Sequence, residues 1–358
     1  MEIDKILKRT LLAIFIFFIV GIIAVGVVFG INILPVDVSD NTPREFVVEN
    51  GMGQNAIADK LEKEGIIKSA FFFKIFIKTT EPEDFKAGKH ILAKNMSVDE
   101  IIGKLVSGET IKQDVVKITF VEGKRFPYYV TKIAENFDFD EESIYNLTGS
   151  DEFLSKIIEK YWFIDEHIKN KDLYYPLEGY LFPDTYEFKK DSTASEVFYK
   201  LLDEMGKKLN TYEEEIKASK YSVHELITLA SLVELEGGLP EDRKMLSGVF
   251  YNRLNSGWSL GSDVTTYYAA RKELTEPIYQ SELNACNAYN TRGNCVKGLP
   301  VGPICSPSIS SIIAAIEPSE STYFYFVADK NKKIYFGETN GDHHKNINDL
   351  KKNNLWPE

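Results

Sequence analysis

An apolar segment in the second half of the chain carries glutamates that could act as acids or bases. The segment, ITLASLVELEGG, begins at Ile227 and ends in two glycines. On a helical wheel of about 100° per residue, Glu234 lies close to Ile227 and Ala230. Glu225 and Glu236 project from the opposite side, so we expect both to be solvated surface charges.

The environment expected for Glu234 matches what a general acid needs. Loss of hydration disfavours the ionised form and moves the pKa of a carboxyl upward, so that it keeps a proton near neutral pH. The alternative is a structural glutamate whose carboxyl bonds to Ser231 or to a nearby backbone amide. The helix pattern alone leaves both interpretations open.

Polar and aromatic side chains gather in the segments before and after this helix. Neutral hydrogen-bonding groups, aromatic rings and Gly-Pro turns suit a polyhydroxylated ligand better than a phosphate or an apolar ligand. Glu178 and Asp263 are further acids that could stabilise charge or orient a substrate. The other candidate substrate-binding residues are Tyr180, Phe182, Asp184, Tyr186, Ser231, Tyr289, Asn290, Thr291, Thr339 and His343.

Several of these residues also have a structural interpretation. Glu178 could stabilise a turn, and the rings of Tyr180, Phe182 and Tyr186 could be ordinary packing. The aromatic residues of YLFPDTYEF stand at even spacing, which predicts a strand, and Pro183 places that strand at an edge or a bend. We expect this strand to form a wall of the site and not part of the core.

The helix that carries Glu234 has clear start and stop signals. Ser222 followed by Glu225 is a capping box, and Gly237 marks the end of the helix. A second amphipathic helix follows it, with apolar residues at Met245, Val249, Phe250 and Leu254. These two helices and the loops around them must position any chemistry.

The preceding part of the chain predicts small α/β modules. Residues 44–112 begin with a strand and a helix, and they contain a capping box at Ser97 and Glu100. A related strand, turn and helix recur from 117, so we expect residues 113–170 to form a connecting α/β subdomain. Residues 171–358 then form the domain that carries the site, and the fold class is α+β.

The N-terminal region predicts a membrane anchor. Residues 11–34 contain no charged residue, and at about 1.5 Å per residue they can cross a hydrocarbon core of about 30 Å. A cleaved signal peptide is the alternative, but its apolar region would be nearer to about 7–15 residues. Basic residues lie in 1–10, whereas aspartates lead the linker at 35–43. The positive-inside rule then makes 1–10 cytoplasmic and the C-terminal part of this single-pass membrane protein extracytoplasmic.

Composition excludes several classes of function. The 358 residues are 44% hydrophobic and 27% charged, which is ordinary globular composition. A net charge of -12 makes nucleic acid and anionic lipid headgroups poor candidate partners. The spacing of Cys286, Cys295 and Cys305 does not match zinc-ligand pairs, so we expect no metal, and no cofactor. A Cys286–Cys295 disulfide and three reduced thiols are equal alternatives.

Five motifs in order carry a resemblance to a known family. They are LEGYLFPDTYEF, LASLVELEGG, FYNRLNSGWSLGSDVTTYY, YNTRGNCVKGLPVGPI and YFYFVADKNKKIYFGETNGDHHKNI. The chain resembles, from its apolar N-terminal helix to its C-terminus, the bacterial endolytic murein transglycosylases known as MltG or YceG-like proteins. The resemblance implies a membrane anchor, a LysM-like module over 44–112 and a catalytic domain over 171–358. It also implies that Glu234 is the catalytic acid.

The resemblance further implies a lytic transglycosylase reaction on peptidoglycan glycan strands. Protonated Glu234 would donate to the glycosidic oxygen between N-acetylmuramic acid and N-acetylglucosamine. It would then accept the proton of the muramyl C6 hydroxyl, which attacks C1 and leaves a 1,6-anhydro end. The cut would limit the length of nascent strands, beside peptidoglycan synthases at the membrane.

Two alternatives stay open. One is a muramidase-type hydrolase in which Glu178 or Asp263 activates water, and the other is a non-catalytic peptidoglycan-binding scaffold of the wall-synthesis machinery. The chain also departs from the family pattern. Its residues at 263–265 and 300–302 replace an Asp-Pro-Thr and a Pro-Pro-Gly, and either His343 or His344 matches the family histidine.

Overall fold

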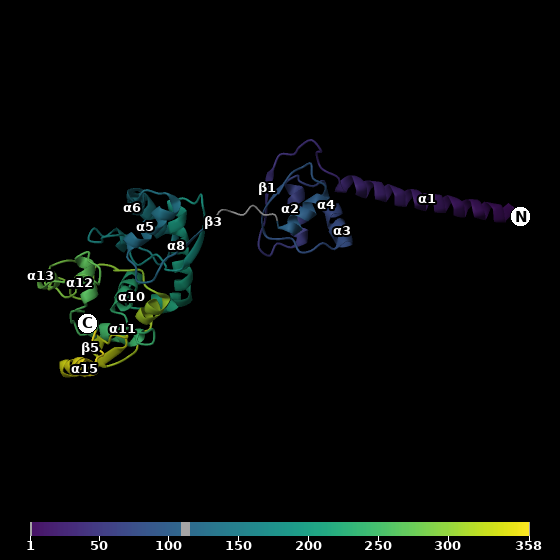
Figure 1. The fold of residues 1–358 in the computed structure, drawn as a ribbon. Helices are drawn as coiled ribbons and strands as arrows, with labels where there is room; N and C mark the ends of the chain where they lie inside the picture. Colours follow the sequence, from purple (N-terminus) through teal and green to yellow (C-terminus); the bar gives the residue numbers. More distant parts are fainter. Residues whose placement is uncertain (1, 109–114, 358) are drawn as a thin grey trace. The chain divides into compact units, whose positions relative to one another are not determined.

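The computed structural model describes residues 2–108 and 115–357, which belong to two compact units (Figure 1). The first unit covers Met1–Gln113 and the second covers Asp114–Glu358. Each unit has a hydrophobic core of its own. Helices and short antiparallel strand pairs make up both units, so the chain is a mixed α and β protein, as the sequence predicts.

The first unit combines a long apolar helix with a small α/β module. Its elements are α1 (Glu2–Ile33), β1 (Arg44–Val48), α2 (Gln54–Lys63), α3 (Ala70–Thr80), β2 (Gly88–Leu92) and α4 (Val98–Ser107). Strands β1 and β2 pair antiparallel with Phe46 opposite His90. The predicted capping box at Ser97 and Glu100 starts α4 and is confirmed. The last residues of the predicted module, 109–112, lie outside the described ranges.

Helix α1 contains a stretch that could cross a membrane. Residues Ile14–Ile33 have a mean hydropathy of 3.1, and none of this stretch is buried. A signal sequence would have the same properties. The side chain of Phe29 in α1 contacts Phe72 and Phe76 of α3, and Lys68 donates a hydrogen bond to the carbonyl of Ile31.

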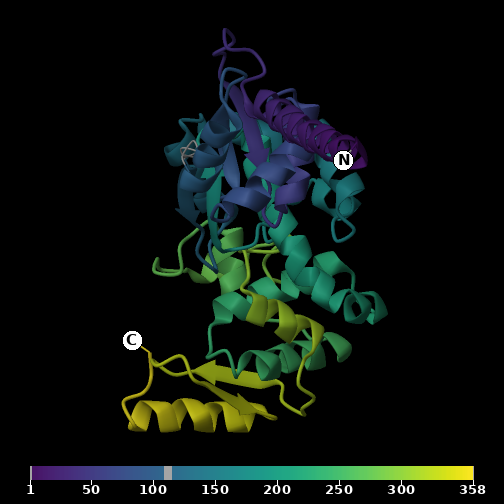
Figure 2. The ribbon, with the colours of Figure 1, turned by 90° about the vertical axis from the view of Figure 1, so that its right-hand side faces the viewer.

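The second unit is mostly helical. Its elements are β3 (Val115–Thr119), α5 (Phe126–Phe137), α6 (Glu141–Thr148), α7 (Asp151–Lys160), the 3₁₀ helix η1 (Glu166–Lys169), β4 (Thr185–Lys189), α8 (Ala194–Leu209), the 3₁₀ helix η2 (Asn210–Tyr212), α9 (Glu213–Ala218), α10 (Val223–Glu236), α11 (Arg243–Asn255), α12 (Asp263–Ala269), α13 (Gln280–Leu283), α14 (Ile309–Ile316), β5 (Tyr325–Ala328), β6 (Ile334–Gly337) and α15 (Asn340–Lys352). In Figure 2, α15 runs alongside the β5–β6 hairpin.

The stretch predicted as a connecting subdomain shares the core of the second unit. Strand β3 pairs antiparallel with β4, which places Ile118 opposite Tyr186. Phe120 stacks on Tyr129 of α5 with ring centroids 4.8 Å apart, and the ring of Tyr186 lies 6.0 Å from that of Phe120. Residues 115–169 therefore pack together with the later helices in one core.

The aromatic segment before β4 is part of the core, so the prediction of a wall outside the core was wrong. Tyr180, Phe182, Tyr186 and Phe188 are all buried, and the strand itself covers only Thr185–Lys189. The physical reason is that α5 packs over this sheet through the ring stack of Tyr129. Even spacing of aromatic residues indicates which side chains share a face, but not whether another layer covers that face.

Helix α10 lies inside the second unit. It begins with the predicted capping box of Ser222 and Glu225 and ends at Gly237, whose φ of 80° continues no helix. It packs against α14 and α11, and all of its residues from His224 to Val233 are buried except Glu225. A helix that is enclosed in this way has no solvent face at its centre. The wheel argument for surface charges therefore fails along the middle of α10.

Candidate active site

Glu234 sits in a closed polar cluster. Its two carboxylate oxygens each lie 3.2 Å from a guanidinium nitrogen of Arg243, at the start of α11. The backbone N–H of Ser308 donates to Oε2 at 2.9 Å, the hydroxyl of Ser311 donates at 2.8 Å, and the Ser308 hydroxyl donates to the same oxygen. The side chains of Glu234 and Arg243 are 8% and 12% exposed.

These contacts bear on the two interpretations of Glu234 that the helix pattern left open. Glu234 is satisfied by five donor contacts, and Ser308 caps α14, so the carboxylate also lies at the positive end of that helix. An acid that gives its proton to a substrate needs an oxygen that is not already occupied by donors. The geometry therefore favours the second interpretation of Glu234, a structural carboxylate that ties α10 to α11 and α14.

Glu236, the last residue of α10, has the properties predicted for Glu234. It is only partly exposed, and burial raises the pKa of its carboxyl to about 7. The negative charge of Asp263 raises this pKa further, whereas the hydrogen bond from Ser262 and the charges of Arg253 and Arg292 lower it. The prediction that Glu236 is a solvated surface charge was wrong, because the loop before α12 covers this end of α10.

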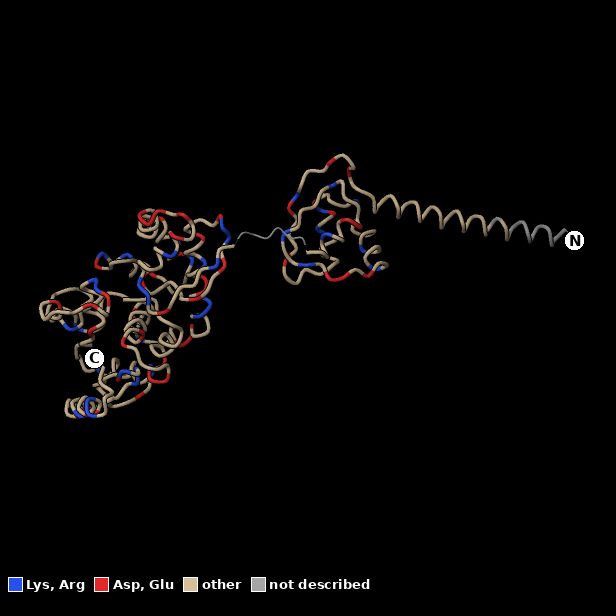
Figure 3. Tube along the Cα trace, in the orientation of Figure 1, with Lys and Arg blue, Asp and Glu red and all other residues tan. Residues whose placement is uncertain are grey.

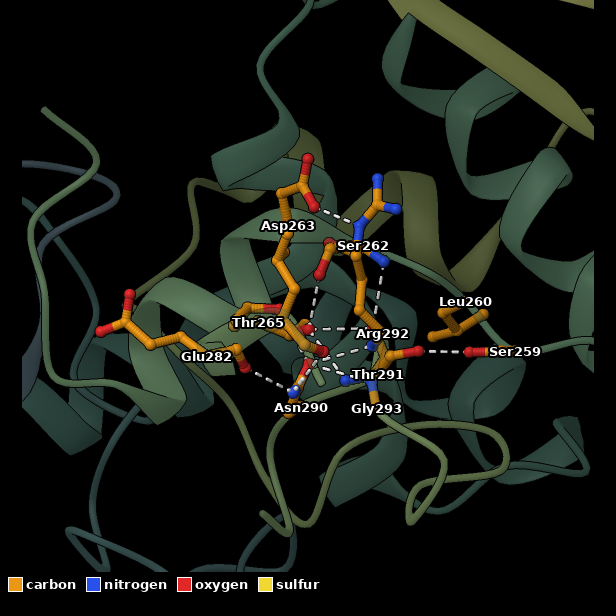
Figure 4. A network of polar contacts seen from close by, with 12 residues as sticks. Ser259, Leu260, Ser262, Asp263, Thr265, Glu282, Asn290, Thr291, Arg292 and Gly293 are labelled. Carbon is orange, nitrogen blue, oxygen red and sulfur yellow. Dashed lines mark hydrogen bonds and ion pairs between the residues drawn. The ribbon is translucent and has the colours of Figure 1, made fainter. Parts of the chain in front are cut away.

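The polar network around α12 holds the partners of Glu236 in place (Figure 4). The hydroxyl of Ser262 donates to Oε1 of Glu236, and the N–H of Ser262 donates to Thr291 Oγ1 at 3.1 Å. Thr291 Oγ1 also lies 2.8 Å from Thr265 Oγ1. Asp263, half-exposed, forms an ion pair with Arg292. The structure thus brings the predicted acid Asp263 beside Glu236 and not beside Glu234.

Asn290 and Thr291 support this network from inside the protein. Asn290 donates to the carbonyls of three residues at Glu282, Leu283 and Ala285, and its Oδ1 accepts from the hydroxyl of Thr266 at 2.8 Å. Both residues, like Tyr289, are completely buried. Direct substrate contact at these positions stays a prediction, and in this structure the polar atoms of Asn290 and Thr291 are occupied by partners within the protein.

The hairpin near the C-terminus contributes a second group of residues. Arg253 donates to the carbonyl of Phe324 at 2.7 Å and lies over the rings of Tyr325 and Phe326 at 6.0 and 5.7 Å. His343 of α15 faces Tyr325, with ring centroids 5.7 Å apart. Burial lowers the pKa of His343, and the charge of Arg253 lowers it further. The charge of Arg253 therefore lowers the pKa of both His343 and Glu236.

Glu178 is a buried structural carboxylate. Its oxygens accept the N–H of Phe126 at 2.9 and 3.1 Å and the hydroxyl of Tyr268 at 2.9 Å. Burial raises the pKa of Glu178 to about 7. With 1% of its surface exposed, it cannot reach a substrate in this structure. The turn-stabilising interpretation fits these contacts, because Glu178 joins the start of α5 to α12.

The remaining predicted residues lie away from a ligand-accessible surface or serve local structure. Ser231 is fully buried and accepts from the N–H of Ile304 at 3.1 Å. The hydroxyl of Tyr180 bonds to Nδ1 of the buried His224, and Phe182 and Tyr186 belong to the core. The other two predicted residues are local anchors: Asp184 Oδ1 accepts from the N–H of Thr185, and Thr339 caps α15. The buried residues among them do not reach the surface in this structure, and their predicted contact with substrate stays untested.

Sequence reasoning missed the arginines that define both acidic sites. Arg243 and Arg253 both belong to α11, whereas Arg292 comes from the loop after α13. The one available signal was the pair of glutamates two positions apart before Gly237, which must point to different sides of a helix. The loop after α13 is closed by a Cys286–Cys295 disulfide, the first of the two alternatives for these cysteines, and Cys305 is free and buried.

Comparison with known proteins shows the family to which this chain belongs. Residues 46–349 match the YceG-like family, which is most of the chain. The chain belongs to the YceG-like family. A relative from Bacillus subtilis (strain 168), named endolytic murein transglycosylase, is 34% identical over 90% of this chain and 89% of its own length. A protein of the same name from Streptococcus pneumoniae serotype 2 is 34% identical over 88% of this chain, which spans 60% of that longer protein.

A solved structure of the YceG-like family shares the fold. The crystal structure of a yceG-like protein from Listeria monocytogenes matches with a TM-score of 0.60 and 31% sequence identity. The match covers 85% of this chain and 99% of the Listeria chain. The resemblance seen in the five sequence motifs is therefore confirmed at the level of the YceG-like family.

Proposed function

We propose that this chain is an endolytic lytic transglycosylase of peptidoglycan in which Glu236 is the acid and base. The observation that carries the assignment is the contrast between the two glutamates of α10. Glu234 is enclosed by Arg243 and three other donors, whereas Glu236 has a pKa of about 7 at the partly exposed end of the helix. The names of the relatives from Bacillus and Streptococcus support the substrate class and the reaction.

The reaction needs one group that first gives and then takes a proton. Protonated Glu236 donates to the oxygen of the glycosidic bond between N-acetylmuramic acid and N-acetylglucosamine, and that bond breaks as positive charge develops at C1. The resulting carboxylate then accepts the proton of the muramyl C6 hydroxyl as its oxygen bonds to C1. The products are a new N-acetylglucosamine end and a 1,6-anhydro muramyl end, and no water is consumed.

A carboxyl with a pKa of about 7 suits both halves of this reaction, because it can gain and lose a proton at neutral pH. Asp263 and the C-terminal end of α10 both favour the protonated form. A second carboxylate is unnecessary as nucleophile, because the C6 hydroxyl is held within the substrate next to C1. Asp263 acts through the pKa of Glu236 and is a positioning residue.

The proposal also covers the first unit, that is, the apolar helix α1 and the small α/β module over residues 44–108. In α1, the 20 residues of Ile14–Ile33 span about 30 Å, the thickness of a hydrocarbon core. Because basic residues precede this stretch and aspartates follow it, we place the second unit on the extracytoplasmic side of the membrane. Residues 44–108, with two helices between the paired strands β1 and β2, are proposed as a LysM-like glycan-binding module. Peptidoglycan synthases that release nascent strands at the membrane are the proposed partners.

The test is mass spectrometry of the products made by the detergent-solubilised full chain from purified uncrosslinked glycan strands. The parent, Glu236→Gln and Glu234→Gln variants are compared, and folding is checked by thermal unfolding. We expect anhydro-ended fragments from the parent and none from Glu236→Gln. Loss of activity only in a folded Glu234→Gln variant would return the acid to Glu234.

The same products separate the two alternative functions. A hydrolase would leave reducing muramyl ends, which are one water heavier than anhydro ends. A scaffold would bind the strands without cutting them, and the Glu236→Gln variant would then behave like the parent. Either result would refute the proposed reaction.

A further inference from the structure

A cavity beside α10 carries an excess of positive charge. Its volume is about 520 Å³, and its lining includes the cations Lys124, Arg125 and Arg271 against one carboxylate, Glu273. The whole chain has the opposite balance, with a net charge of -12. Figure 3 shows acidic residues spread along the chain in both units, whereas the lining of this cavity has more cations than carboxylates.

The two arginines lie over tyrosine rings, and the charge of Arg125 also acts on the buried carboxyl of Glu178. The guanidinium carbon of Arg271 is 4.2 Å from the ring centre of Tyr174, and that of Arg125 is 5.2 Å from the ring centre of Tyr268. Within residues 2–108 and 115–357, no carboxylate forms an ion pair with Lys124, Arg125 or Arg271. A stacked guanidinium keeps its in-plane N–H groups available, and these match the two oxygens of a carboxylate.

The cavity reaches α10 one residue away from the proposed acid. Leu235, which lies between Glu234 and Glu236 in the chain, lines it, and so does Tyr268 of α12. The residue that caps the other end of α12, Ser262, donates to Glu236. Because α12 has seven residues, its two ends are about 10 Å apart. A substituent of a sugar held at Glu236 can span that length.

We propose that this cavity binds an anionic group of the glycan strand, the carboxylate of the peptide stem on the muramyl residue that reacts at Glu236. The inference rests on the proposed function and names the part of the substrate that the second unit selects. A polyprenyl pyrophosphate at the end of a nascent strand has related chemistry. The stem carboxylate is the better occupant, because an endolytic cut falls within the strand, whereas the pyrophosphate marks its end.

The experiment removes charge from either side of the contact. The full chain, Arg271→Gln and the Lys124→Gln/Arg271→Gln double variant are compared with Lys132→Gln, an exposed α5 lysine outside the cavity. Three strands are used: with free stem carboxylates, with these converted to neutral amides, and with an added polyprenyl pyrophosphate end. Cleavage gives kcat/KM, and isothermal titration gives binding without requiring cleavage.

We expect amidation to lower kcat/KM and affinity of the parent about tenfold or more, as for loss of one charge-assisted contact. Arg271→Gln should lose about tenfold on free carboxylates and change little on amidated strands, while Lys132→Gln matches the parent. Equal affinities of parent and double variant would overturn the inference. The inference would also be overturned if the double variant lost affinity only for the strand with the pyrophosphate end. A parent that binds selectively but does not cleave would refute the proposed function alone.

Discussion

The pH dependence of cleavage is a direct consequence of the environment of Glu236. A glutamate with the ordinary pKa of 4.5 is about 0.3% protonated at pH 7, whereas a pKa of about 7 leaves about half of the molecules protonated. The surroundings of Glu236 therefore increase the share of the protonated form by about two orders of magnitude. Because the protonated form starts the reaction, activity is present below this pKa and is lost as the pH rises through about 7.

Two substitutions should shift the pH at which activity is lost, the alkaline limb of the pH profile, in opposite directions. Asp263 raises the pKa of Glu236 and Arg292 lowers it, and the two form an ion pair, so removing one also frees the charge of the other. We expect Asp263→Asn to shift the limb to lower pH and Arg292→Gln to shift it to higher pH. Because both side chains are about half exposed, each shift should be about 0.5–1 pH unit.

The assay is the initial rate of anhydro-end formation by the full chain between pH 5 and pH 9. Between pH 6 and pH 8 the parent rate should fall about tenfold, and Glu236→Gln should lose about 10²–10⁴-fold at every pH. Glu241→Gln, an exposed carboxyl in the loop after α10, is the matched control and should follow the parent. The reasoning is refuted if the limb stays in place in both charge variants, or if Glu236→Gln keeps the parent profile.

Three further predictions concern stability and the membrane. Glu234→Gln leaves Arg243 as an unpaired buried cation and should lower the free energy of unfolding of the second unit in urea by about 3 kcal/mol. The control is Glu225→Gln, whose side chain can still bond to the N-cap residue Ser222. If both variants lose the same free energy of unfolding, the ion pair of Glu234 with Arg243 does not stabilise the unit. Gly179→Ala should cost about 2 kcal/mol or more, because its φ is 83° and the new Cβ would lie 2.4 Å from Pro303 Cβ. Gly51→Ala has a similar φ of 81° but open space, so a similar loss of urea stability there would show that contact with Pro303 is unimportant. The membrane prediction uses a nitroxide label on Phe71→Cys or on Lys63→Cys in protein reconstituted into bilayers. Because α3 packs on Phe29 of the apolar helix α1, the exposed position 71 should lie nearer the bilayer and be more accessible to oxygen than position 63. Equal accessibility of the two labels to an aqueous nickel complex would contradict a membrane anchor.

Local patterns predicted the elements of the fold well. The capping residues Ser97 and Ser222 and the stop at Gly237 mark helix ends in the structure as they do in the sequence, because a cap depends on residues within one turn. The apolar stretch 11–34 likewise falls within one helix up to Ile33. The five family motifs in order were also sufficient to indicate the YceG-like family.

The site itself depends on contacts between distant segments. A helical wheel gives the angle between Glu234 and Glu236, but it does not say which side meets water. The structure places Arg243 and Ser308 around Glu234 and the loop at Ser262 over Glu236, so the carboxyl on the apolar side is neutralised by an ion pair. The desolvated acid lies on the side that was expected to be solvated. Sequence therefore defined the helix and its two carboxyls, and tertiary packing decided their roles, because the pKa of a buried acid depends on charges and burial contributed by other elements.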